Sequence, residues 1–511
     1  MTPRILRAAL GALALSSFVA GFSGCSSPVE LASFDNAYAS SYAVVVSKST
    51  YDDPAWRDVA DSLANKRNAT LIVYEGDVSS AKAKLAARMP LYTAFVAKPE
   101  ECGRGYIGKI HVLVRDLDDD PFEDTVWGVI TGIDAEGAKR VALASRPPVI
   151  DTALGTTGLN FDRFEAAYYI SDGKAGDWAE KSAKDGVVRS AGHDKPDALD
   201  WKIKFDALSP KLLVTSSHGY EHGFEMPFGR GFILAKDGDL YALDTAKPKA
   251  STQPLAKIDR TDSPRVWLAA GNCLVGHVSD KYAVTPTFLS HYGAVQVAGY
   301  TVTTWNGAAG WGALDQWQSL PGRYTMSEAI WFNQQAIIAE LNALDPAAAK
   351  FAYPYDESHQ DGMISDAFLG AAEKSGVAIA KDWGRSNKTP EFRKVALLWD
   401  RDGFALYGDP MTEARLARPK ADQPYTTSFE QLSSDRFRFV LQVNDPGAAA
   451  DNRHPVGALF MKRIKGAKIV SGQEYDPVVA DNFILVRKPR PMGKGNTLVI
   501  EFEGEPQEDA R

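Results

Sequence analysis

The chain has few cysteines, no surplus of positive charge and no long apolar run beyond its first residues. Three cysteines occur among 511 residues, so they cannot all pair within the chain, and a chain of this length can bury a sizeable core without cross-links. The 57 basic and 65 acidic residues give a net charge of −8. Such a surface does not attract phosphate backbones, so we expect no nucleic acid partner.

The remaining composition is that of an ordinary globular protein. Hydrophobic residues make up 45% and charged residues 24% of the chain, which argues against disorder or coiled coil as the main state. At about 150 residues per domain, the length predicts roughly three domains. After the N-terminal segment, no stretch reaches the roughly 18 apolar residues that a membrane-spanning helix needs.

The first 25 residues have the pattern of an export signal. Arg4 and Arg7 precede a short apolar run over 8–22, and small residues lead to Cys25, which is typical of a secretory signal. The end of this segment resembles a bacterial lipobox, which implies lipidation at Cys25 and a tether over 26–40. We therefore expect an exported protein of the bacterial cell envelope, periplasmic or lipid-anchored to the outer membrane, with simple secretion or an uncleaved anchor as alternatives.

Short apolar runs then alternate with amphipathic patterns. Strands are expected at 42–46, 70–74, 92–96, 126–130, 211–215, 265–270, 294–298, 395–399 and 404–407, helices at 53–66, 78–89, 135–144 and 326–341, and either at 110–117. This alternation predicts an α/β fold with a mostly parallel sheet flanked by helices.

The pattern changes after about residue 419. Short runs at 437–443, 457–461, 482–486 and 497–502 are separated by turns, with no helical period between them. They predict a separate all-β, Ig-like sandwich over 420–511. The preceding chain divides into an N-terminal α/β subdomain over 41–170 and a second α/β subdomain over 171–419.

Two expected strands end in reactive residues 55 positions apart. One is followed by His218-Gly219 and the other by Cys273. Reactive groups collect at the carboxyl ends of parallel strands, so the topology predicts an imidazole and a thiol at one edge. A nearby imidazole activates a thiol, which attacks only as thiolate. The N–H groups of Gly219 and Cys273 are candidate oxyanion donors.

These motifs resemble the gingipain family of the caspase-like clan of cysteine peptidases. The matching segments are His218-Gly219, Cys273-Leu-Val-Gly276, Gly293-Ala294 with Gly299, Gly408-Asp409-Pro410, and the acidic stretch Asp120–Asp124. The resemblance implies a caspase-like catalytic subdomain over 171–419, a β-sandwich after it, and an endopeptidase that cleaves polypeptides through a Cys273–His218 dyad and a thioester acyl-enzyme.

Other site residues follow less directly. Asp120, Glu123 and Asp124 are candidates for the acid that orients His218, with a solvated acidic turn as the alternative. Asn272 departs from the pattern, since such peptidases have Ala or Ser before the nucleophile.

The substrate pocket has three candidate residues. Trp305, Trp311 and Asp315 follow the strand at 294–298, and the tryptophans are flanked by glycines. They are candidates for an aromatic wall and for a charge selecting a basic residue, with a packed loop as the alternative for the tryptophans.

Two other functions remain open. The fold could serve a catalytically silent surface protein that binds a partner. The segment His218-Gly-Tyr-Glu221-His222 matches the H-x-x-E-H zinc peptidase signature, but that motif needs a helix, and its glycines disfavour one. No cofactor is expected, and a structural calcium ion is left without assigned residues, since Asp116–Asp120 only resembles the start of a calcium loop.

Overall fold

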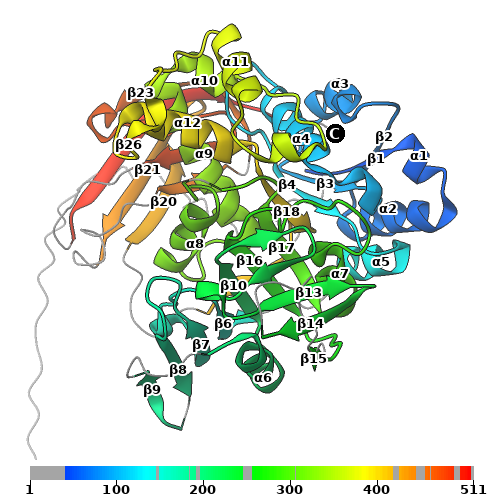
Figure 1. The fold of residues 1–511 in the computed structure, drawn as a ribbon. Helices are drawn as coiled ribbons and strands as arrows, with labels where there is room; N and C mark the ends of the chain where they lie inside the picture. Colours follow the sequence, from blue (N-terminus) through cyan, green and yellow to red (C-terminus); the bar gives the residue numbers. More distant parts are fainter. Residues whose placement is uncertain are drawn as a thin grey trace, which may run out of the picture.

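The structure is a computed structural model that describes residues 41–144, 149–182, 184–190, 196–244, 256–304, 306–417, 425–444, 455–460, 462–487 and 495–507. Figure 1 shows the helices and strands of these segments. Cys25, the tether over 26–40 and Trp305 lie outside the described residues, so the lipidation site and one candidate pocket residue stay predictions.

A twelve-stranded sheet organises the α/β part of the chain, as predicted. Its spatial order is β2 (Thr70–Tyr74), β1 (Tyr42–Ser47), β3 (Tyr92–Val96), β4 (Val126–Ile130), β18 (Phe404–Gly408), β17 (Ala294–Tyr300), β16 (Arg265–Gly271), β10 (Leu212–Ser216), β6 (Thr152–Gly155), β7 (Ala166–Ile170), β8 (Trp178–Ser182) and β9 (Gly186–Arg189). The runs of β-branched and apolar residues form these strands because most of them are buried on both faces.

The sheet has two halves that run in opposite directions. β18 is parallel to β4 and antiparallel to β17. From β17 onward, the neighbouring strands β17, β16, β10, β6 and β7 all run parallel to one another. The carboxyl ends of these five strands therefore meet at one edge. The predicted His218 and Cys273 segments both leave the sheet at that edge.

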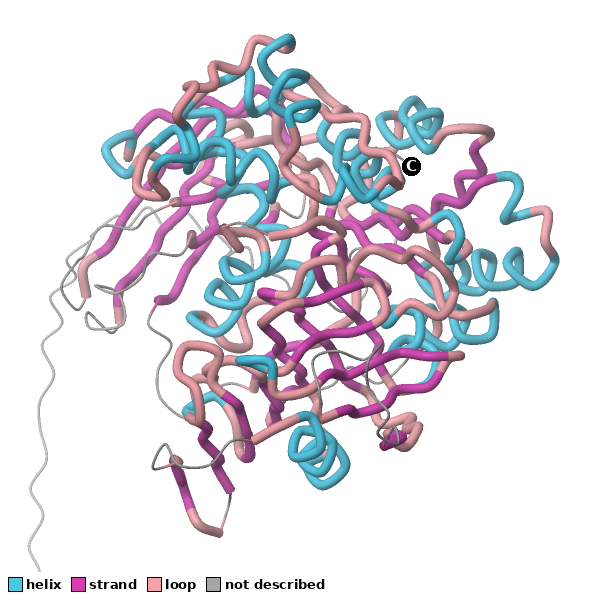
Figure 2. Tube along the Cα trace, viewed as in Figure 1, coloured by secondary structure: helices cyan, strands magenta, loops and turns pink. Residues whose placement is uncertain are grey.

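Two groups of helices pack on the sheet, and within each group the helices contact one another (Figures 1 and 2). One group consists of α2 (Pro54–Arg67), α5 (Ala135–Ala142) and α7 (Val284–His291), and the other of α8 (Gly310–Ser319), α9 (Met326–Leu344) and α12 (Pro390–Arg401). The remaining helices are α1 (Lys48–Tyr51), α3 (Lys82–Ala86), α4 (Arg104–Arg115), α6 (Ala198–Leu208), α10 (Pro346–Lys350) and α11 (Asp366–Lys374).

One segment differs from the sequence prediction, and another settles a choice that the sequence left open. The expected strand at 395–399 is wrong, because these residues belong to helix α12, which begins after the capping residue Thr389 with Pro390 in its first turn. All five residues are buried, and a short apolar run buried on every side does not distinguish helix from strand. The undecided segment at 110–117 lies mostly in helix α4.

A small antiparallel sheet follows β10 and carries His218 at its edge. It contains β11 (Gly219–Tyr220), β12 (Gly223–Glu225), β13 (Phe232–Lys236), β14 (Asp239–Leu243) and β15 (Ala256–Lys257), in that order. A two-stranded sheet pairs β5 (Val149–Ile150) with β19 (Arg415–Leu416).

The C-terminal part is all β, as predicted, and consists of two antiparallel sheets. One contains β20 (Tyr425–Gln431), β21 (Arg436–Val443), β26 (Thr497–Pro506) and β23 (Ile464–Ser471), and the other β22 (Val456–Leu459), β25 (Phe483–Val486) and β24 (Pro477–Val479). Stacked rings of Phe429, Phe437, Phe460 and Phe502 fill its core.

The hydropathy of the described helices gives no membrane-spanning candidate, because none of them is both long and apolar enough to cross a bilayer. Cys102 is fully buried, and burial raises the pKa of its thiol. This thiol is therefore a packed core group with no nucleophilic character.

Candidate active site

Two neighbouring parallel strands carry the predicted dyad residues. β10 ends at Ser216 and β16 ends at Gly271, and these two residues are partners in the register. His218 and Cys273 each lie two positions beyond these partners. The topology therefore brings the two segments to the same edge of the sheet, as the strand ends predicted.

Close backbone packing explains the glycines of both motifs. A Cβ atom on Gly219 would lie 2.5 Å from the Cys273 carbonyl oxygen and 3.2 Å from the Cys273 nitrogen. A Cβ atom on Gly276 would lie 2.3 Å from the carbonyl oxygen of Gly299, on β17. Both contacts exclude larger residues, so His-Gly and Cys-x-x-Gly are needed for the segments to lie against each other.

Asn272, the residue that departs from the family pattern, joins the two segments. Its side chain is fully buried, and Nδ2 donates a hydrogen bond to the carbonyl of Ser217 at 3.0 Å, with the His218 carbonyl at 3.4 Å. Alanine or serine could not reach these carbonyls in the same way. The asparagine thus fixes the spacing between the backbone of the imidazole segment and that of the thiol segment.

The backbone is strained beside each predicted dyad residue. Ser217 has a φ of 102° and Leu274 a φ of 59°. A non-glycine residue in such a conformation costs of the order of 1–3 kcal/mol, and such strain is concentrated at functional sites. The strained residues precede His218 and follow Cys273 directly, so the surrounding contacts hold both segments in conformations that they would not adopt alone.

The surroundings of Cys273 favour the protonated thiol. Its Sγ atom accepts a hydrogen bond from the Thr304 N–H at 3.4 Å. Burial raises the pKa of the thiol, the Thr304 hydrogen bond lowers it, and the negative charge of Asp400 raises it further. The net result is a pKa above that of an ordinary cysteine, which favours the thiol over the thiolate at neutral pH.

Asp400 is bonded to the segment that also contains Thr304, the hydrogen-bond donor to the thiol. It is fully buried, and its Oδ2 accepts the Ala308 N–H at 2.6 Å. Burial raises its pKa to about 7. The sequence indicated a strand over 395–399, so this acid at the end of helix α12 was missed.

His218 is exposed at the mouth of the site. Within the described residues, no hydrogen bond joins its ring to Cys273. The two-residue strand β11 and the three-residue strand β12 form a tight hairpin directly after it, with Gly219 opposite Phe224. This register places His218 opposite Glu225, whose N–H donates to the His218 carbonyl at 2.9 Å.

Glu225 was not predicted as a site residue. The carboxyl is partly buried; burial raises its pKa and the positive charge of His218 lowers it. The turn is Glu221-His222, between the paired Tyr220 and Gly223. It lacks the Asn-Gly or Asp-Gly sequence typical of such hairpins, so no sequence signal placed Glu225 across from His218.

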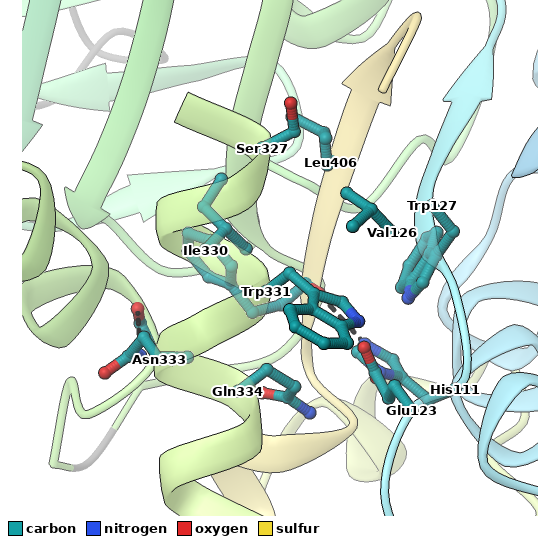
Figure 3. Close-up of a pocket in the computed structure, with 12 residues that line it drawn as sticks. His111, Glu123, Val126, Trp127, Ser327, Ile330, Trp331, Asn333, Gln334 and Leu406 are labelled. Atoms are coloured by element: carbon teal, nitrogen blue, oxygen red, sulfur yellow. Dashed lines mark hydrogen bonds and ion pairs between the residues drawn. The ribbon is translucent and has the colours of Figure 1, made fainter. Parts of the chain in front are cut away.

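The three acids proposed from the sequence have other partners. Glu123 Oε1 accepts a hydrogen bond from the His111 ring, at 2.8 Å from Nδ1. The pair lies in a pocket between β4, β18 and helix α9 (Figure 3). The lining residues are His111, Glu123, Val126, Trp127, Ala309, Ser327, Ile330, Trp331, Asn333, Gln334, Phe404 and Leu406. Neither His218 nor Cys273 lines it.

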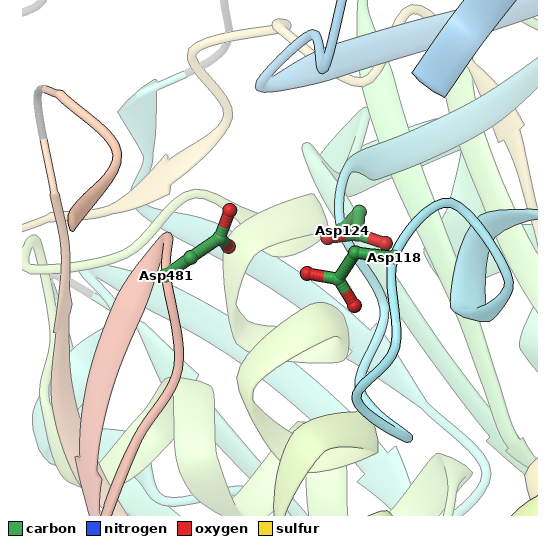
Figure 4. A group of neighbouring side chains, drawn as sticks. All are labelled: Asp118, Asp124 and Asp481. Atoms are coloured by element: carbon green, nitrogen blue, oxygen red, sulfur yellow. The ribbon is translucent and has the colours of Figure 1, made fainter. Parts of the chain in front are cut away.

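Asp124 belongs to an acidic group where the loop after α4 meets the C-terminal sheets (Figure 4). The charges of Asp118 and Asp481 in this group also act on Asp120. Asp118, Asp124 and Asp481 offer carboxylate oxygens within 4.8 Å of one another, a spacing that a cation could use. Arg463 already contributes a positive charge there, since its Nη1 lies 2.6 and 2.7 Å from the Asp481 oxygens and 3.3 Å from Asp124 Oδ1.

Burial dominates the titration of this acidic group. It raises the pKa of Asp120 to about 7 and that of Asp124 to about 8, where the Arg463 charge opposes the rise. Asp120 also accepts the Phe122 N–H at 2.8 Å. The contact between Asp124 and Arg463 joins the α/β part to the C-terminal sheets.

Of the predicted pocket residues, Trp311 lies beside the thiol segment. A Cβ atom on Gly271, two residues before Cys273, would lie 3.1 Å from its Cζ2 atom. Asp315 is exposed one turn further along helix α8. The role of both residues in substrate selection stays a prediction.

The zinc motif adopts a conformation that zinc peptidases do not use. His218, Glu221 and His222 lie on and beside the β11–β12 hairpin, and His222 Nε2 is 2.9 Å from Asp280 Oδ2. The motif needs one helical face that carries both histidines about one turn apart. A hairpin does not provide that face.

The comparisons with known proteins found little. No protein family matches the chain, and no curated protein matches it. A solved structure described as "Structure of Protease" aligns over 91% of this chain and 97% of its own, with 10% identity and a TM-score of 0.35. A similarity of this size leaves the function to be argued from the site.

Proposed function

We propose that the chain is a cysteine endopeptidase in which Cys273 is the nucleophile and His218 the general base. The observation that carries the proposal is the junction of the β10 and β16 ends, where Gly219 packs on the Cys273 backbone and Asn272 bonds to the Ser217 carbonyl. Nucleophile and base must lie within reach of each other, and this junction fixes their two segments together.

The proposed reaction is acyl transfer. The His218 ring takes the Cys273 proton, and Sγ attacks the scissile carbonyl carbon to form a tetrahedral intermediate. The C–N bond breaks as the amine takes the proton from the imidazolium, leaving a thioester. Water then attacks the thioester with His218 as base, which releases the carboxylic acid and restores the thiol.

The raised thiol pKa fits a site that is activated by substrate. Hydrogen bonds of catalytic groups are often long or absent without substrate and tighten in the complex. The N–H groups of Gly219 and Cys273 remain the proposed oxyanion donors.

We also propose a finer assignment of the fold, as a gingipain-like catalytic unit followed by an Ig-like domain. A large α/β sheet with reactive strand ends, followed by two antiparallel sheets, is compatible with a gingipain-like catalytic unit and an Ig-like domain. The proposed partner is a polypeptide substrate. Export and lipidation at Cys25 are proposed from the N-terminal sequence, and loss of fatty-acid incorporation in Cys25→Ala would test them.

Hydrolysis of denatured casein and of a fluorogenic peptide library tests the main proposal. We expect cleavage by the wild-type protein and its loss, by at least about 100-fold, in Cys273→Ala and in His218→Ala. Retained cleavage in Cys273→Ala would overturn it. Full cleavage by His218→Ala would remove the imidazole from the mechanism.

One observation favours a second candidate, a silent protein that binds through the same edge of the sheet. The thiol pKa is raised, and the imidazole is exposed without a hydrogen bond to Sγ in the described residues. Absence of cleavage across the library, together with saturable peptide binding that Cys273→Ala leaves unchanged, would favour this function over catalysis.

A further inference from the structure

We propose that Glu225 is the positioning residue for His218, supplying the carboxylate that orients the imidazole and stabilises its protonated form. The inference rests on the proposed peptidase function. It concerns a residue outside the sequence motifs, which lies on the strand opposite the histidine.

The register of the hairpin carries the proposal. Gly219 pairs with Phe224 and Tyr220 with Gly223 in antiparallel orientation, so the next pair outward is His218 and Glu225. The Glu225 N–H donates to the His218 carbonyl at 2.9 Å, which confirms that pairing. Residues directly opposite each other in an antiparallel pair have Cβ atoms about 4.5–5.5 Å apart and side chains on the same face.

The charges of the two side chains suit this role. The carboxyl of Glu225 is partly buried, and the imidazole is its oppositely charged neighbour when protonated. As His218 takes the thiol proton, it becomes a cation, and a facing carboxylate stabilises that cation and limits rotation of the ring.

The backbone around the pair is held from three directions. The His218 carbonyl accepts a hydrogen bond from the Glu225 N–H. Asn272 Nδ2 donates to the carbonyl of Ser217, the residue before His218. On its other side, Glu225 in β12 pairs with Phe232 in β13. The carboxylate is therefore carried by a sheet strand rather than by a free loop. A strand of a paired sheet is the kind of rigid support that a positioning group needs.

Other carboxyls do not fill this role in the described structure. Glu123 is bonded to His111, and Asp124 is paired with Arg463. Asp280 lies against His222 instead of His218. Glu225 is thus the carboxyl that the register places opposite the proposed base.

The test compares Glu225→Gln and Glu225→Asp with a matched control, Asp237→Asn. Asp237 is exposed in the β13–β14 turn of the same small sheet, with a φ of 51° that asparagine also accepts. The control therefore removes one negative charge close in sequence without touching the pair. Thermal melting of all variants shows whether they fold.

We expect Glu225→Gln to lower kcat by about 10- to 100-fold with less than a threefold change in KM, because substrate contacts remain. Glu225→Asp should restore part of the rate, and Asp237→Asn should match the wild type.

The inference is overturned if folded Glu225→Gln keeps the wild-type kcat. It is also overturned if Glu225→Asp is as impaired as Glu225→Gln, because a role of the charge predicts rescue. Failure of the peptidase proposal looks different, since then the wild type and Cys273→Ala would show the same background cleavage.

Discussion

The side-chain amide of Asn272 donates a hydrogen bond to the carbonyl of Ser217 at 3.0 Å, across 55 positions of sequence. It ties the strand end that carries Cys273 to the one that carries His218. A polar residue at a position where the gingipain resemblance implies Ala or Ser therefore has a structural role, and its side chain is buried.

Replacement of Asn272 should lower activity without removing either reactive group. We expect Asn272→Ala to reduce kcat/KM by about 10- to 100-fold, because misplacement of a catalytic segment by about 1 Å can cost that much. Asn272→Asp should be worse, since a carboxylate oxygen would face the Ser217 carbonyl. Steady-state kinetics on one fluorogenic peptide measures both effects, and wild-type kinetics in Asn272→Asp would contradict this role.

The reactivity of Cys273 should increase at unusually high pH. Burial and the Asp400 charge raise the pKa of its thiol, so the thiolate forms above the range of about 8.5 that is typical of free cysteine. Iodoacetamide alkylation of the substrate-free protein, followed by mass spectrometry of the Cys273 peptide, should have its midpoint above that pH.

Asp400→Asn should lower that alkylation midpoint. The substitution removes a negative charge near the thiol but keeps an oxygen for the Ala308 N–H. The pKa of Asp400 is about 7, so the difference from wild type should appear above pH 7, where the acid is ionised. Identical alkylation profiles for the two proteins would contradict the electrostatic account.

The acidic group near Arg463 should make stability fall as pH rises. The folded-state pKa values of Asp120 and Asp124 are about 7 and 8, whereas an unfolded aspartate titrates near 3.9. The folded state therefore holds protons that the unfolded state releases, and this stabilisation is lost between about pH 4 and 8. Melting temperatures across this range should decline more steeply for the wild type than for Asp120→Asn.

If the difference in melting temperature between the wild type and Asp120→Asn does not change with pH, the raised pKa values are contradicted. Asp120→Asn keeps the oxygen that accepts the Phe122 N–H, so its folded structure should be retained. At pH 8 the variant should be the more stable protein, because a buried negative charge has been removed.

Removal of Arg463 should loosen the attachment of the C-terminal sheets. Its guanidinium is buried between Asp124, Asp481 and the Met89 carbonyl. Breaking a buried ion pair from one side costs about 3–5 kcal/mol, so Arg463→Ala should lower the unfolding free energy in urea by that order. An unchanged urea midpoint of unfolding at pH 7 would show that the Arg463 contacts do not stabilise the fold.

Local patterns predicted the strands that hold the site with good accuracy. The expected ends at 215 and 270 lie within one residue of the observed ends at Ser216 and Gly271, because a buried parallel strand is a run of apolar residues that stops at a polar turn. The same logic failed at 395–399, where a helix is buried on every side.

Pairings between distant residues were outside the reach of sequence patterns. Asp124 is joined to Arg463, 339 residues later, and nothing near either residue indicates the other. The Glu225–His218 pairing is local, but the turn Glu221-His222 lacks the Asn-Gly or Asp-Gly sequence that predicts a tight hairpin.

Covalent trapping of the Cys273 thiol, in which sulfur displaces a carboxylate leaving group to form a thioether, tests the central claim most directly. The protein is incubated with a mixture of peptidyl acyloxymethyl ketones that vary in the residue before the ketone, and the adduct is located by mass spectrometry. The account predicts one adduct on Cys273 in the wild type, formed at least about 100-fold more slowly in His218→Ala. No adduct on Cys273, or an equal rate in both proteins, would contradict it.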